Sequence, residues 1–202
     1  MNSKKIFVFD FCGTLVSKQT ADLFVSYVLK KQSNYSAYLY SLFLRKFQRN
    51  KKFDLLKLLK GSKKQDLEFL AISYANYLKD YKILKVYERI KKILKQKGTK
   101  VYVISAGYSI YIKQFFKNYD VEVISNDFKY TKDLFDGEIC LNDCFGENKL
   151  KRFKETLNEK DIDKNFIIDE SYSDSFTDEP IFQISEKKFF VKDNNIMNKD
   201  DL

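Results

Sequence analysis

The sequence predicts an α/β fold, in which a doubly wound, Rossmann-like parallel sheet carries an inserted helical cap. Short apolar or β-branched runs alternate with helical patterns along the chain, as in parallel sheets covered by helices on both faces. Residues 17–85 interrupt this alternation, because they show helical patterns but no convincing strand. We therefore expect an α/β core formed by residues 1–16 and 86–202, and a cap formed by residues 17–85.

Each expected element rests on a local pattern. Residues 6–9, 101–104, 121–124, 166–168 and 189–191 are short apolar runs of the length expected for buried strands. Helical spacing recurs within the insertion, at Leu67, Leu70, Ala71, Tyr74 and Leu78. A helix should follow the insertion, with one apolar face and a C-terminal glycine cap, at Val86, Ile90, Ile93, Leu94 and Gly98.

Composition narrows the classes of function. The 202 residues include no histidine, which excludes imidazole bases, imidazole zinc ligands and Ser-His-Asp triads. Cys12, Cys140 and Cys144 lack the CxxC spacing of zinc or redox sites, so we expect free thiols in a reducing, cytoplasmic compartment. The longest uncharged run, residues 32–44, is too short and too polar for a membrane span.

The formal net charge of +9 raises the question of a nucleic-acid partner. The lysines are scattered along the expected helices, and no nucleic-acid-binding module is visible. We therefore expect the charge to attract a small anionic substrate, and we expect no nucleic acid. The sequence predicts no particular oligomeric state.

Candidate functional residues follow two of the expected strands. Asp10 follows the run 6–9, and Gly13 then turns the chain, which presents a carboxylate at the edge of a parallel sheet. Ser105, Ala106 and Gly107 follow the run 101–104, where small residues let backbone N–H groups approach an anion. The alternatives are a turn-capping aspartate and an ordinary strand–helix turn.

Two further segments lie downstream. Lys149 opens an amphipathic helix and is a candidate for neutralising phosphate, with Lys151 as its rival. The acidic segment 169–180 follows an apolar run and offers hard oxygen ligands of the kind that Mg²⁺ prefers. An acidic surface loop is the alternative for this last segment.

Together these four segments resemble the ordered motifs of the haloacid dehalogenase (HAD) superfamily, in its phosphoserine-phosphatase-like branch (subclass IB). The matching stretches are FDFCGTL, ISAGY, FDGEICLNDCFGENKLKRF and YSDSFTDEPIF. The insertion 17–85 matches the helical cap of that branch in position, but hardly in sequence. The resemblance implies a phosphatase that acts on a small phosphorylated substrate.

The resemblance also implies roles for individual residues. Asp10 would be the nucleophile, and one of its oxygens would bind Mg²⁺ together with the Cys12 backbone carbonyl and Asp174. Asp178 would support the water shell of the metal. Asp169 and Glu170 also stand near the strand end, so a metal-supporting role for them stays open.

A second set of residues would contact the substrate. Ser105, the backbone of Gly107 and Lys149 would stabilise the transferring phosphoryl group, next to Ala106. From the cap, Gln19, Thr20 and Asp22 are candidate substrate contacts, although the alternative is a simple helix start with Thr20 as N-cap.

Cys12 stands where most phosphatases of the superfamily carry a second Asp, which protonates the leaving group and later activates water. Such assistance is worth about 10²–10⁴ in rate. The FDFCGTL variant resembles proteins associated with bacterial surface (capsule) polysaccharide pathways, which implies a phosphorylated amino alcohol, sugar or nucleotide-sugar derivative as substrate. A catalytically impaired relative that binds a phosphorylated ligand or partner, and a phosphotransferase, are the alternatives.

Overall fold

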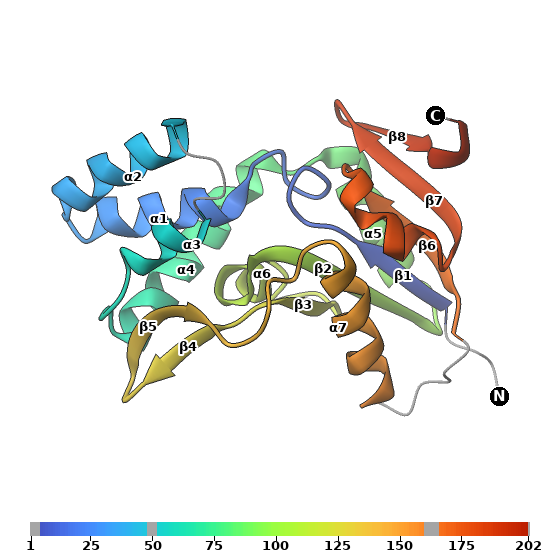
Figure 1. The fold of residues 1–202 in the computed structure, drawn as a ribbon. Coiled ribbons are helices and arrows are strands. Elements are labelled where there is room, and N and C mark those ends of the chain that lie inside the picture. Colours follow the sequence, from blue (N-terminus) through green and yellow to red (C-terminus); the bar gives the residue numbers. More distant parts are fainter. Residues whose placement is uncertain (1–4, 48–51, 160–165, 202) are drawn as a thin grey trace.

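The structure is a computed structural model that describes residues 5–47, 52–159 and 166–201. Within these ranges the main sheet has six strands in the order β3-β2-β1-β6-β7-β8 (Figure 1). Neighbouring strands are parallel except β7 and β8, which pair antiparallel. The strands are β1 (Lys5–Phe9), β2 (Thr99–Tyr108), β3 (Glu122–Asn126), β6 (Ile168–Ser173), β7 (Ser185–Lys192) and β8 (Asn195–Asn198).

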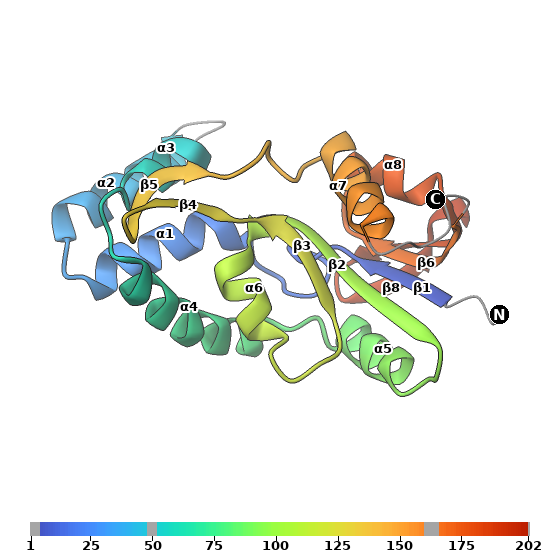
Figure 2. The same ribbon diagram turned by 90° about the horizontal axis from the view of Figure 1, so that it is seen from below.

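Helices cover both faces of this sheet (Figure 2). On one face lie α5 (Leu84–Leu94) and α6 (Ser109–Phe115), and on the other lie α7 (Glu147–Asn158) and α8 (Glu179–Phe182). Alternate side chains of β1 serve the two faces. Phe7 and Phe9 join the hydrophobic cluster with Ile90, whereas Ile6 and Val8 join the cluster with Phe153. The doubly wound α/β fold predicted from the sequence is confirmed.

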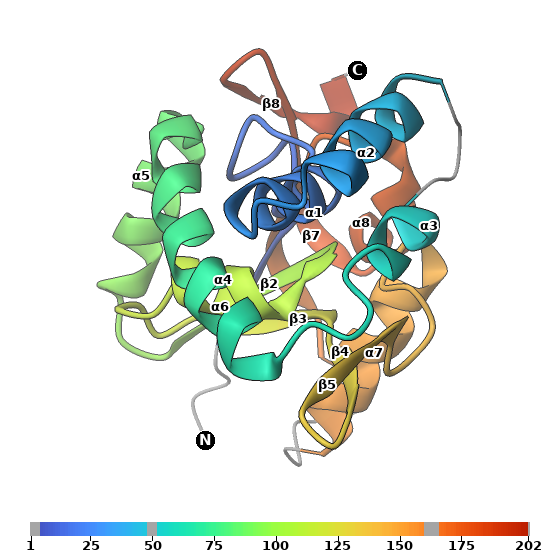
Figure 3. The ribbon, with the colours of Figure 1, turned by 90° about the vertical axis from the view of Figure 1, so that its left-hand side faces the viewer.

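The segment after β1 is helical, as expected. It contains α1 (Thr20–Lys31), α2 (Tyr35–Phe47), α3 (Lys52–Lys57) and α4 (Lys64–Leu78), which face the viewer in Figure 3. None of the helices in the described ranges is long and apolar enough to cross a membrane. Short 3₁₀ turns complete the chain, at Lys79–Tyr81, Phe176–Asp178 and Lys199–Asp201.

A hairpin that the sequence did not predict lies against this helical segment. It consists of β4 (Phe128–Thr131) and β5 (Leu134–Ile139). Gly61 donates its N–H to the carbonyl of Phe135 at 2.8 Å, and Phe135 donates to Ser62 at 2.9 Å. The division into a core and a 17–85 cap stays a prediction, and we propose that the hairpin extends the cap.

Three local expectations were wrong. The strand expected at residues 166–168 is β6, which begins only at Ile168 and continues through polar residues. Its Glu170 is buried because Arg89 and Tyr172 both donate hydrogen bonds to the carboxylate. Strand β2 continues beyond Ser105 to Tyr108, and α5 ends at Leu94, so Gly98 (φ +74°) belongs to the following turn and is not the helix cap.

Candidate active site

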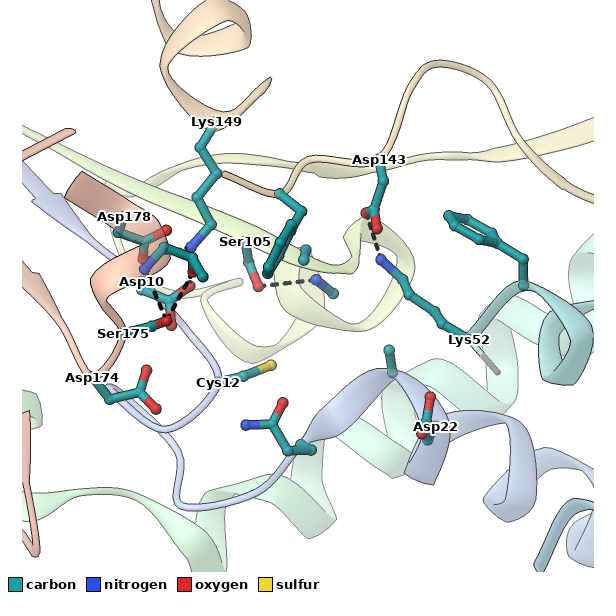
Figure 4. A pocket seen from close by; sticks show the side chains of 17 residues that line it. Asp10, Cys12, Asp22, Lys52, Ser105, Asp143, Lys149, Asp174, Ser175 and Asp178 are labelled. Carbon is teal, nitrogen blue, oxygen red and sulfur yellow. Dashed lines mark hydrogen bonds and ion pairs between the residues drawn. The ribbon is translucent and has the colours of Figure 1, made fainter. Parts of the chain in front are cut away.

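A cavity of about 550 Å³ lies beside the carboxyl ends of β1, β2 and β6 (Figure 4). Parallel strands bring these ends to one edge of the sheet, which is where α/β proteins place their ligands. Residues from all four sequence segments line the cavity: Asp10, Cys12, Ser105, Ala106, Gly107, Lys149, Asp174 and Asp178. The fold therefore brings the four segments together at one cavity.

Lys149 occupies the centre of the charged part of the cavity. Its ammonium donates hydrogen bonds to Asp10 and to Asp178, each at 2.7 Å, and all three side chains are buried. Burial lowers the pKa of Lys149, but the two carboxylates raise it by more, so the ammonium stays charged. The rival Lys151 is exposed on the outside of α7.

The turn after β1 positions a third carboxylate. Gly13 has φ +78°, and a Cβ atom built on it would lie 2.0 Å from Oδ2 of Asp174. The Thr14 hydroxyl lies 3.2 Å from Asp174 Oδ1 and 3.3 Å from Asp10 Oδ2, and it accepts the backbone N–H of Asp174 at 3.0 Å. A glycine in the left-handed region thus lets Asp174 approach the strand that carries Asp10.

Carboxylates outnumber ammonium groups in this part of the site, where Asp10, Asp174 and Asp178 line the cavity together with Lys149. Burial raises the pKa of Asp10 to about 7, although Lys149 opposes the shift, and burial also raises the pKa of Asp174. Oδ1 of Asp178 is buried without a hydrogen-bond partner in the described part of the chain. A further cation would relieve this imbalance.

The donor set fits Mg²⁺ but is not a side-chain cage. In the described ranges, no group of three or more His, Cys, Asp or Glu side chains forms a metal centre. The predicted set needs only two carboxylates, from Asp10 and Asp174, because its third ligand is the backbone carbonyl of Cys12. Mg²⁺ commonly takes one or two carboxylates and fills its remaining positions with water and phosphate.

In the second segment, the side chain of Ser105 hydrogen-bonds to the backbone of Gly107. Ser105 is fully buried, and its hydroxyl accepts the backbone N–H of Gly107 at 3.0 Å. Since the hydroxyl accepts in this contact, its own proton remains available for an anion in the cavity. Gly107 has no room for a side chain, because a Cβ would lie 2.7 Å from the Tyr111 hydroxyl.

Cys12 lines the cavity and begins a chain of polar contacts that continues to the buried Thr20 and Tyr111. Its Sγ lies 2.9 Å from the Thr20 hydroxyl, which lies 2.7 Å from the Tyr111 hydroxyl. Burial raises the pKa of the Cys12 thiol, and the negative charge of Asp10 raises it further. The thiol is therefore protonated at neutral pH and is equipped to donate a proton rather than to accept one.

The cap-side candidates divide into two groups. Gln19 and Asp22 line the cavity, whereas Thr20 is fully buried and reaches it only through Cys12. The structure therefore does not place Thr20 where a substrate could touch it. The alternative in which Thr20 is the N-cap is also wrong, since Gln19 occupies that position and Thr20 is the first helical residue.

Sequence reasoning missed the far wall of the cavity. Lys52 from α3 forms an ion pair with Asp143, at 2.5 Å (Figure 4). Phe53 and Phe145 also line the cavity. The Asn126 amide also donates to Asp143, at 2.7 Å. Nothing in the local sequence distinguishes Lys52 from the many solvated lysines, so no signal pointed to this pair.

The acidic residues left open at β6 lie outside the cavity. Asp169 accepts the backbone N–H of Ile6 at 2.7 Å, at the start of β1, and Glu170 pairs with Arg89. Neither carboxylate lines the cavity, whereas Asp174 does.

A parallel sheet with buried carboxylates and a lysine at its carboxyl edge has the architecture of an α/β enzyme. The family model of the haloacid dehalogenase-like hydrolases matches residues 7–183 of the chain. The chain therefore belongs to this hydrolase family, and the resemblance seen in its motifs is confirmed at the level of the superfamily. No match was found among curated proteins.

Solved structures share the fold at low sequence identity. A protein of unknown function from Bordetella pertussis Tohama I has a TM-score of 0.77 at 16% identity, over 93% of this chain and 89% of that one. A phosphoserine phosphohydrolase-like protein from Francisella tularensis subsp. tularensis SCHU S4 has a TM-score of 0.58 at 18% identity, over 91% of this chain and 85% of that one. A phosphoserine phosphatase in apo form has a TM-score of 0.55 at 19% identity, over 92% of this chain and 84% of that one.

The HAD family hydrolase t0658 from Salmonella enterica subsp. enterica serovar Typhi matches with a TM-score of 0.53 at 19% identity. The match covers 90% of this chain but only 60% of the Salmonella protein. The chain thus spans less than two thirds of the length of that relative.

Proposed function

We propose that the chain is a Mg²⁺-dependent phosphatase that hydrolyses a small phosphate monoester through an aspartyl-phosphate on Asp10. The observation that carries the proposal is the buried hydrogen bond of 2.7 Å between Lys149 and Asp10 at the edge of a parallel sheet. A carboxylate nucleophile next to a fixed cation suits phosphoryl transfer, in which positioning and electrostatic stabilisation supply most of the catalysis.

The proposed reaction has two displacements. A carboxylate oxygen of Asp10 attacks phosphorus, and the bond from phosphorus to the ester oxygen breaks, which frees the alcohol. Water then attacks the same phosphorus and releases inorganic phosphate, which restores the carboxylate. Lys149 and the Ser105 hydroxyl would bind the phosphoryl oxygens in both steps.

Mg²⁺ bound by Asp10, Asp174 and the Cys12 carbonyl would supply positive charge to the phosphoryl oxygens. HAD phosphatases generally use this ion. Three aspartates and one lysine line this part of the cavity and support the same proposal, because the carboxylates outnumber the ammonium group. Asp178 would hold Lys149 in place through its own hydrogen bond.

Cys12 would act as the proton donor for the departing alkoxide. The raised pKa of its thiol keeps a proton available at neutral pH, but it also makes the thiol a weaker acid than a carboxyl group. Donation would leave a Cys12 thiolate, which would take the proton of the attacking water in the second displacement and so restore the thiol. We therefore propose that protonation of the leaving group in the first displacement is slow, unless the substrate or the cap supplies an acid.

A phosphate-release screen tests the proposed function. The panel contains phosphorylated amino alcohols, amino acids, sugars and nucleotide-linked phosphates, each with Mg²⁺. We expect release from at least one ester, and its loss in Asp10→Asn and in EDTA. The exposed Asp193→Asn is the matched control and should keep full activity. Full activity in Asp10→Asn would exclude the aspartyl-phosphate mechanism.

A second candidate is a protein that binds a phosphorylated ligand without turnover, and Cys12 is the observation that favours it. The variant Cys12→Asp separates the two candidates, because it restores a carboxylic acid–base group at that position. For a weakened enzyme we expect turnover of simple aryl phosphates to rise by up to about 10²-fold. A binding protein would show ligand-dependent thermal stabilisation but no phosphate release in either form.

The proposed substrate is a phosphorylated amino alcohol, sugar or nucleotide-sugar derivative, and the proposed context is bacterial surface-polysaccharide synthesis. The context rests on the resemblance of the FDFCGTL segment alone. The cavity of about 550 Å³ has room for a ligand of this size, and its wall offers both charged and aromatic groups. Three free cysteines support a reducing, cytoplasmic location.

A further inference from the structure

Helix α2 presents an unusually apolar face to solvent. We call its exposed large side chains the outer α2 face: Tyr35, Leu39, Tyr40, Leu42, Phe43 and Phe47. Tyr35, Leu39 and Phe47 are each more than 60% exposed. A solvent-facing helix surface is normally polar, and a contiguous apolar patch indicates an interaction site.

The outer α2 face is not needed to hold the helix in place. The opposite side of α2 buries Ser41 and Leu44, and Ser41 lies within hydrogen-bond distance (3.0 Å) of Ser26 on α1. Figure 1 places α2 at the outermost edge of the molecule, on the side away from both chain termini. The exposed side chains therefore remain outside after α2 has packed on α1.

The charged side chains on this helix and on the end of α1 that leads into it are basic. Helix α2 contains Arg45 and Lys46 but no Asp or Glu, and the last turn of α1 carries the exposed Lys30 and Lys31. On α2 itself, the Lys46 ammonium lies 5.3 Å from the centre of the Phe47 ring, and the rings of Phe43 and Phe47 are 4.9 Å apart. Aromatic rings and lysine thus share a single surface.

We propose that the outer α2 face docks on an anionic lipid surface. The rings and leucines would enter the boundary between headgroups and acyl chains, while the lysines would remain among the anionic headgroups. Docking on a lipid surface accounts for both the exposed apolar side chains and the basic residues, because an interfacial helix combines an apolar face with flanking Lys and Arg. The protein would be peripheral, since it lies on the surface and does not span it.

Charge and side-chain type argue against other occupants. A two-fold dimer through α2 would bring the same basic surface of two chains together, and like charges would oppose it. Single-stranded nucleic acid binds by stacking its bases on aromatic rings. Leu39 and Leu42 offer no such platform, but they do favour insertion among acyl chains.

Sedimentation with lipid vesicles tests the proposal on the full chain. Vesicles of equal parts phosphatidylglycerol and phosphatidylcholine are compared with vesicles of phosphatidylcholine alone. We expect the wild type to bind the anionic vesicles and to be released by high salt. The double variant Leu39→Ser/Phe43→Ser and the charge variant Lys46→Glu should each bind at least about tenfold more weakly.

Phe69→Ser is the matched control, because Phe69 is 69% exposed on α4, outside the outer α2 face. It should bind vesicles as the wild type does, and all variants should keep the wild-type thermal midpoint. Absence of wild-type binding, or equal binding to both vesicle types, would overturn the proposal. So would a concentration-dependent dimer or DNA complex that the α2 variants abolish while vesicle binding is absent.

Discussion

At Gly13 the absence of a side chain decides where a carboxylate lies. The residue adopts φ +78°, and the space that its Cβ would fill is occupied by the Asp174 carboxylate. Two requirements thus coincide at one position: a left-handed backbone and a close approach of the fourth sequence segment to the first. A glycine meets both.

Gly13→Ala separates these two requirements when it is compared with Gly98→Ala. Gly98 has a similar φ of +74° but no atom within 4 Å of its Cβ position. Each variant should lose about 1–2 kcal/mol of unfolding free energy through backbone strain. Only Gly13→Ala should also displace Asp174 and so reduce phosphate release and Mg²⁺ binding. Urea unfolding and activity assays measure the two effects, and equal activity in both variants would contradict this account.

At the scale of elements, α3 and the loop before α7 meet across the cavity. The ion pair between Lys52 and Asp143 joins them, and the Asn126 amide fixes Asp143 from β3. The helices α1 and α4 share one hydrophobic cluster with α6, so they are firmly attached. The ion pair between Lys52 and Asp143 is easier to separate than this cluster, because partly exposed ion pairs contribute little stability.

The variant Asp143→Asn should therefore weaken the contact between α3 and the loop before α7 without touching the reacting groups. We expect KM for the substrate to rise about two- to fivefold, since substrate binding must then hold these two segments together, while kcat changes little. Glu138→Gln breaks the exposed pair with Lys129 and serves as the control. Steady-state kinetics decides, and a fall in kcat with unchanged KM would show that Asp143 has a different role.

The strands with buried, continuous apolar runs were predictable from the sequence, and so was the helical insertion. The β4–β5 hairpin was not, because its two short strands contain no continuous apolar run. Backbone hydrogen bonds to the distant Gly61 and Ser62 hold it in place. In the site, the order of motifs indicated Lys149 over Lys151. The pair between Lys52 and Asp143 depends on tertiary packing of distant segments, which no local pattern encodes.

Across the whole molecule, the formal net charge of +9 contrasts with the acidic cavity. The basic surface would attract anionic ligands over distance. Inside, the aspartates outnumber the lysine, so the folded state carries a local electrostatic strain that a bound cation would remove. The stability of the fold should therefore depend on pH and on Mg²⁺ together.

The sign of that dependence follows from Asp10. Its ordinary pKa of 3.8 rises to about 7 in the folded protein, because it is buried. The folded state then binds the proton more tightly than the unfolded state, so metal-free protein should lose stability as the pH rises through this interval. Urea unfolding in EDTA from about pH 5 to about pH 8 should show a falling free energy of unfolding. Asp10→Asn should flatten this slope, and Mg²⁺ at the upper pH should stabilise the wild type more than the variant. Equal slopes in both proteins would show that Asp10 is not the group responsible.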